Sequence, residues 1–192
     1  VENWIAIQRD LTSQRDMVTG LENRDLFFFY VDEALLDADD TSSHVVLYLR
    51  VAELRGISDL DYMSRDTLLR KVATRLQNVL PQESIVTRME GDNFGMFVPV
   101  TESGSGPDDL ARRVLETTLT PFEIDDRHVR AITYVGVATI HSENRPQAEA
   151  AVSSARIAAD YAQHRQDAQT QQEAQFAMFE PTMREQRQAR NQ

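Results

Sequence analysis

The residues of this chain best suited to chemistry lie in one short segment, residues 88–94, which reads RMEGDNF. Apolar residues on both sides of Gly91 and Asp92 predict two strands joined by a tight hairpin, because glycine accepts the positive φ that such a turn requires. Asp92 is the carboxylate at this turn, and carboxylate oxygens can hold a divalent cation. Taken alone, however, a hairpin of this kind is usually just a turn.

A second motif lies about seventy residues upstream, where residues 16–24 read DMVTGLENR. Together, in this order, the two motifs resemble the GGDEF family, the diguanylate cyclase domains of bacterial signalling. That family usually reads D-x-L-T-G-L-x-N-R near its start and R-x-G-G-[DE]-E-F at its active hairpin. The resemblance covers roughly residues 16–165. It implies an α/β sandwich with a mixed central sheet flanked by helices, similar to the nucleotidyl cyclase and polymerase palm.

The hairpin matches the family signature at Gly91, Asp92 and Phe94 and departs from it at two positions. The resemblance makes Asp92 the retained catalytic and metal-binding carboxylate. Asn93 replaces the usual glutamate and removes an anionic group. Glu90 replaces the usual glycine, and its side chain either adds bulk and repels phosphate or points harmlessly into solvent.

The other metal-binding carboxylate of the family follows its first core strand, in a pattern resembling D-x-D-x-F-K-x-I-N-D. Residues 50–59 here read RVAELRGISD, so Arg50 replaces that aspartate. Two unit charges about 4 Å apart interact by about 4 kcal/mol at an effective dielectric constant of about 20, so this cation repels Mg²⁺. Because the two strands should be adjacent, we predict that Arg50 and Asp92 form an ion pair in place of the metal bridge.

The family's nucleotide contacts are also altered. Ser58 falls where the family has the asparagine that binds the base, and a hydroxyl cannot make the paired amide contact. Asp66 falls where a carboxylate contacts guanine, but an aspartate can equally cap a helix, and both readings stay open. Gln163 replaces a phosphate-binding lysine. Residues 81–84 read PQES, so the family's R-x-x-D inhibitory site is expected to be absent.

Composition narrows the function classes. The 192 residues carry a formal net charge of −11, which argues against a surface that binds nucleic acid or an anionic membrane. The chain has no cysteine, which excludes disulfides and agrees with a cytoplasmic location. Its four histidines are scattered without metal-ligand spacing. No apolar run approaches the roughly twenty residues that span a bilayer.

Hydrophobic spacing predicts helices and strands in alternation. In chain order we expect a helix capped by Asn23, a buried strand at 45–49, a helix with an apolar stripe at 68–80, the hairpin, a helix from Pro107, a strand at 129–140 paired with 122–124, and a helix at 148–162. The run of four aromatic residues at 27–30 is expected to belong to the helix core, but a continuous run must expose some member, which would be a candidate for domain contact.

Three segments are expected. Residues 1–15 resemble the last strand and exit of PAS sensor domains, residues 16–167 form the GGDEF domain, and residues 168–192 form a polar linker toward an EAL-like domain. Neighbouring PAS-like and EAL-like domains, GTP and a second copy in a homodimer are therefore the expected partners.

The leading hypothesis is a regulatory and interaction module of cyclic-di-GMP signalling that has lost cyclase activity. In one variant it binds GTP through Asp66 and Asp92 without cyclising it, and Mg²⁺ would be needed only with that nucleotide. The alternative is an active diguanylate cyclase that converts two GTP to cyclic-di-GMP. A third reading makes this segment the modulator of a phosphodiesterase domain elsewhere in a longer protein.

Overall fold

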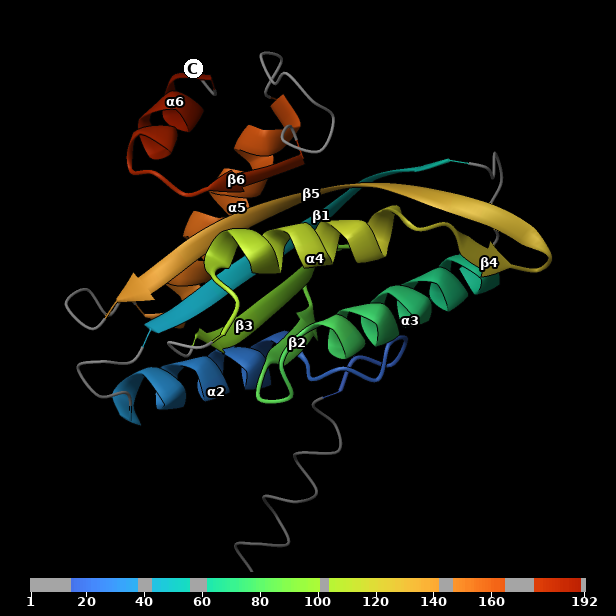
Figure 1. Ribbon diagram of the computed structural model, residues 1–192, viewed down its shortest axis with the longest axis horizontal. Helices are drawn as coiled ribbons and strands as arrows, with labels where there is room; N and C mark the ends of the chain where they lie inside the picture. The colour runs from blue at the N-terminus through green and yellow to red at the C-terminus, as the bar shows by residue number, and fades with distance from the viewer. Residues whose placement is uncertain are drawn as a thin grey trace, which may run out of the picture.

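The computed structural model describes residues 15–37, 43–55, 62–100, 104–141, 147–164 and 175–190. Along the chain the elements are α2 (Arg24–Asp37), β1 (Ser43–Arg55), α3 (Tyr62–Val79), β2 (Ile85–Arg88), β3 (Phe94–Val100), α4 (Pro107–Leu119), β4 (Phe122–Ile124), β5 (Arg127–His141), α5 (Ala148–His164), β6 (Phe176–Met178) and α6 (Thr182–Arg190) (Figure 1).

The strands form one mixed sheet in the order β2-β3-β1-β5-β4, with β6 added beside β5. β1 lies at the centre and runs antiparallel to both β3 and β5. β6 runs parallel to β5. The predicted α/β architecture with a mixed central sheet is therefore confirmed.

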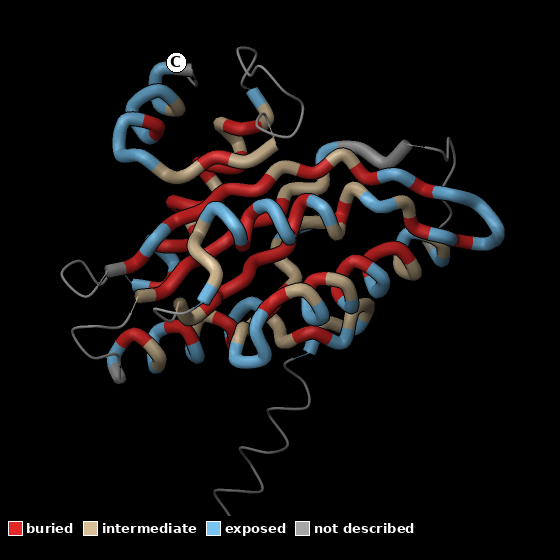
Figure 2. The backbone as a smooth tube through the Cα atoms, in the orientation of Figure 1, coloured by how far each residue is buried: buried red, intermediate tan, exposed pale blue. Residues whose placement is uncertain are grey.

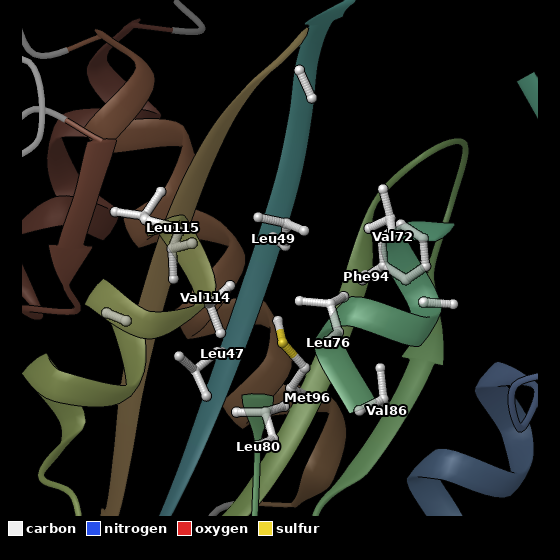
Figure 3. Close-up of a cluster of buried hydrophobic side chains, with 14 of the residues drawn as sticks. Leu47, Leu49, Val72, Leu76, Leu80, Val86, Phe94, Met96, Val114 and Leu115 are labelled. Carbon is white, nitrogen blue, oxygen red and sulfur yellow. The ribbon is translucent and has the colours of Figure 1, made fainter. Parts of the chain in front are cut away.

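The alternation of side chains along β1 divides the core into two layers. Val45, Leu47 and Leu49 lie in a cluster with buried residues of α3 and α4, and Figure 3 shows Leu76 and Val114 among them. Val46 and Tyr48 lie instead in the cluster that holds buried residues of α2 and α5. In Figure 2 the central strands are correspondingly red, while the outer faces of the helices are pale blue.

Local signals in the sequence account for several element boundaries. The Asn23 side-chain oxygen accepts a hydrogen bond from the backbone N–H of Leu26 at 2.9 Å, which confirms the predicted cap of α2. α4 begins at Pro107, where its missing N–H costs nothing. Asp125 and Asp126 both have positive φ, and they form the predicted turn between β4 and β5.

The polar C-terminal part packs on the domain. Phe176 pairs with Val135 in the sheet, and Met183 of α6 is buried against Ile157 of α5. The sequence predicted only a linker over residues 168–192, and the part described here, residues 175–190, lies on the sheet and α5. The PAS-like segment 1–15 lies almost entirely outside the described residues, so the three-segment division stays a prediction. None of the described helices is both long and apolar enough to cross a bilayer.

Candidate functional site

The hairpin has the predicted tight turn at Gly91. Its φ is +66°, and a Cβ placed there would meet nothing within 4 Å, so the glycine is required by conformation rather than by space. The backbone N–H of Asn93 donates to the carbonyl of Glu90 at 3.3 Å, and that of Met89 donates to the carbonyl of Asn93 at 2.8 Å. The turn thus presents Asp92 at its tip.

Asp92 is held by arginine. The Arg65 guanidinium of α3 donates from Nε to one carboxylate oxygen at 3.1 Å and from Nη2 to the other at 2.6 Å. Arg88 adds a second positive charge 3.9 Å away, and the Asp92 side chain is only 14% exposed. A bidentate arginine contact occupies both oxygens, so a cation would have to displace this ion pair to bind Asp92.

Arg50 pairs with Asp160 of α5, with 2.6 Å between Nη1 and a carboxylate oxygen, and the predicted pair between Arg50 and Asp92 is wrong. The strands are adjacent as expected, since Leu49 pairs with Phe94. However, Arg50 continues the side-chain series of Tyr48, which faces α5, whereas Asp92 is held by α3 on the other face of the sheet.

Asn93 fastens the hairpin to the end of β1. Its side-chain oxygen accepts a hydrogen bond from the backbone N–H of Val51 at 3.2 Å, and its amide nitrogen donates to the carbonyl of Glu90 at 2.9 Å. An ionised glutamate, the usual residue here, has no hydrogen to donate. The change from the family signature therefore replaces an anionic group with a structural amide.

Tyr48 lies buried next to these groups. Its burial raises the pKa of the phenol above the usual value of 10.0, while the positive charges of Arg156 and Arg50 oppose that shift. The phenol is therefore a neutral hydroxyl at physiological pH, available for hydrogen bonding and not for general base catalysis.

Arg88 joins the two sequence motifs that suggested the fold. Its guanidinium lies 3.4 Å from the Asp16 carboxylate and donates to the carbonyl of Gly91 at 2.9 Å. Asp16 also accepts hydrogen bonds from the backbone N–H and the hydroxyl of Thr19, each at 2.7 Å. Burial alone would raise the pKa of Asp16, but Thr19 and Arg88 outweigh it and lower that pKa below 3.8.

The remaining predicted residues take different places. Asp66 lies within α3, four residues after the helix begins at Tyr62, so its reading as a helix cap is wrong. Ser58, the predicted contact for the base, lies outside the described residues. Phe94 is fully buried in the core, and Glu90 is exposed. The nucleotide-binding roles of Ser58 and Asp66 stay predictions.

The described residues do not suit a divalent cation. Within those ranges no group of three or more His, Asp or Glu side chains is placed to hold a metal ion. Asp92 is paired with Arg65, and Arg50 is paired with Asp160. At the hairpin, the Asp92 carboxylate is paired with Arg65 and lies near Arg88.

Sequence reasoning missed the two partners that define these ion pairs, Arg65 and Asp160. Arg65 lies on a helix, one residue before the candidate Asp66, and nothing in its spacing indicates a contact 27 residues away. Asp160 lies in the alanine-rich helix α5, among residues that are buried. A carboxylate in such a position usually has a partner, and this was the signal that could have indicated the ion pair. A cavity between α2 and α5, described below, was missed as well.

The protein is thus a mixed α/β domain. The turn of its β2–β3 hairpin lies beside the end of the central strand β1, where Asn93 contacts Val51. The family model described as "Diguanylate cyclase, GGDEF domain" matches residues 13–169, and the chain belongs to the GGDEF family.

Similar proteins include both named cyclases and named phosphodiesterases. The chain is 26% identical over 134 residues to the diguanylate cyclase TpbB of Pseudomonas aeruginosa, covering 66% of this chain and 31% of that protein. It is 30% identical over 129 residues to the cyclic di-GMP phosphodiesterase PdeR of Escherichia coli, covering 67% of this chain and 19% of that protein. The chain thus spans less than a third of either relative.

The fold is shared with solved structures. The isolated GGDEF domain of TpbB from Pseudomonas aeruginosa superposes with a TM-score of 0.71 at 22% identity, covering 91% of this chain and 99% of that one. A sensory box/GGDEF family protein from Caulobacter crescentus gives a TM-score of 0.64 at 24% identity, covering 75% and 94%. At this identity the likeness concerns the fold.

Proposed function

We propose that this chain is a regulatory GGDEF domain of cyclic-di-GMP signalling that does not convert GTP to cyclic-di-GMP. The observation that carries the proposal is the bidentate ion pair between Asp92 and Arg65. It engages the one signature carboxylate that the chain retains. Arg50 supports the case, because the resemblance to the family puts it at the position of the other carboxylate, and here it pairs with Asp160.

The proposed domain acts through neighbours in a longer protein. Its curated relatives are several times longer than the matched segment, and they carry names of opposite activities. A domain of this fold can therefore belong to either kind of protein. We propose a PAS-like segment before it and an EAL-like domain after it, with α6 as the physical connection to the latter.

Calorimetric titration of GTP, once with Mg²⁺ and once with a chelator, tests this function. The proposal predicts that any binding of GTP persists in the presence of the chelator, because Arg65 and Arg88 already neutralise Asp92. Mg²⁺-independent binding would support the variant in which GTP is sensed and not cyclised. Tight binding that needs Mg²⁺ and is lost in Asp92→Asn would contradict the proposal and favour an active cyclase.

A further inference from the structure

A cavity of about 430 Å³ opens on the face of the sheet that carries α2 and α5. This volume lies in the range typical of sites for small molecules. Four parts of the chain that are distant in sequence surround it, namely α2, the hairpin, α5 and α6. Its lining residues include Arg24, Phe28, Met89, Glu90, Arg156 and Arg184.

Three guanidinium groups line this cavity in a protein that is otherwise strongly acidic. Arg24 reaches Glu149 only at 3.8 Å, and both side chains are about half exposed or more, so this pair is weak. Arg184 donates to the hydroxyl of Ser154 at 2.7 Å and lies over the Phe179 ring, and neither contact compensates its charge.

Arg156 carries the strongest indication of a missing partner. It forms no ion pair with any residue that the structure describes, and its Nε is buried without a hydrogen-bond acceptor. A buried polar atom without a partner is uncommon in folded proteins and calls for an explanation. Since Arg156 lines the cavity, an anion bound there would supply the missing counter-charge.

Two carboxylates, Glu90 and Glu149, line the same cavity. They would repel a bare polyanion, but they can accept hydrogen bonds from N–H or O–H groups of a ligand. Phe28 and Met89 add apolar surface beside them. The lining thus matches a molecule with one anionic end and one ring or chain that bears donors.

We propose that this cavity binds a small organic phosphate, with Arg24, Arg156 and Arg184 around the phosphate. Arginine suits this role because its planar fork of donors matches phosphate oxygens. The site is separate from the Asp92 carboxylate, which faces α3. Because Arg184 belongs to α6, a bound phosphate also holds that helix against the domain, which gives the ligand a route to a following domain.

Calorimetric titration of adenosine 5′-monophosphate into the full chain tests the proposal, since this probe has a dianionic phosphate, an aromatic ring and N–H donors. We expect saturable binding below millimolar concentration, and no binding of adenosine, which lacks the phosphate. Arg156→Gln and Arg24→Gln should each weaken binding by about tenfold, as expected for the loss of one charge-assisted contact.

Arg113→Gln is the matched control, because it makes the same charge change on an exposed position of α4. Asp92→Asn distinguishes this cavity from the ion-paired carboxylate at the hairpin turn, and both variants should bind the probe as the parent chain does. Arg24 is about half exposed, so its variant tests the site even if Arg156→Gln fails to fold. No binding of the nucleotide, equal binding of adenosine, or an equal loss in Arg113→Gln would overturn the proposal.

Discussion

The Asp16 carboxylate connects the two sequence motifs of the family. It stabilises its own turn through Thr19 and reaches the hairpin through Arg88, which itself contacts Gly91 and Asp92. The two motifs, far apart in sequence, therefore form one network of contacts. This network joins the turn at residues 16–19 to the hairpin turn at residues 91–92.

The lowered pKa of Asp16 predicts a pH-dependent contribution to stability. Its charged form is favoured in the folded state, so the contribution is present above pH 3.8 and is lost as the pH falls through the folded-state pKa. Asp16→Asn should cost about 1–2 kcal/mol at pH 7, and this cost should shrink at pH 3. Thermal unfolding at the two pH values measures both.

Asp25→Asn serves as the control, because Asp25 is an exposed carboxylate in the first turn of α2. It should unfold close to the parent chain at both pH values. If Asp16→Asn were as stable as the parent at pH 7, or if its deficit were unchanged at pH 3, the proposed role of the Asp16 charge would be wrong.

At Gly136, strand β5 passes so close to helix α5 that no side chain would fit between them. A Cβ at Gly136 would overlap the backbone of Ala155 and Ala159, which cannot move without shifting α5. The sequence pattern around this glycine predicts a strand, but it does not reveal how closely the helix passes over it.

Gly136→Ser should therefore destabilise the protein by about 3 kcal/mol or prevent folding, since overpacked sites relax poorly. The same change at Gly106, where a Cβ would meet nothing within 4 Å, should alter stability by no more than about 0.5 kcal/mol. Chemical denaturation measures both differences. Comparable losses at the two positions would refute the close packing of α5 on β5.

The elements themselves were largely predictable, because apolar spacing determines helix and strand before any contact is known. The stripe ending at Leu80 became α3, and the turn at Asp125 and Asp126 joins β4 to β5 as expected. The ion pairs were not predictable in this way. Because their strands are adjacent, Arg50 and Asp92 were predicted to pair. Their side chains point in different directions, and Arg50 pairs with Asp160 of α5 while Asp92 pairs with Arg65 of α3.

At the scale of the whole molecule, helix α6 packs on α5 and contacts two polar sites of the domain. Met183 packs on α5, Arg184 lines the cavity, and Arg187 lies 3.7 Å from Asp160, which also binds Arg50. The C-terminal helix thus contacts the same charged group as the end of β1. The docking of α6 involves Met183, Arg184 and Arg187 and no continuous apolar stripe, so the polar composition of this segment did not predict it.

Met183→Ala should detach this helix in part and lower stability by about 2 kcal/mol, which corresponds to a fall of about 4–8 °C in the unfolding midpoint of a domain this size. Met17→Ala is the matched control, because Met17 is 98% exposed and should tolerate the change. Equal midpoints for the two variants would show that α6 does not pack on α5 in solution.

The central claim is that this domain keeps the GGDEF fold without cyclase turnover. The most direct test is to measure cyclic-di-GMP formed from GTP and Mg²⁺ by the purified chain at high protein concentration, which favours any dimer. The account predicts no product, because Arg65 engages Asp92 and because Arg50 is proposed to stand where the family has its second carboxylate. Product that appears with the parent chain and disappears with Asp92→Asn would contradict it.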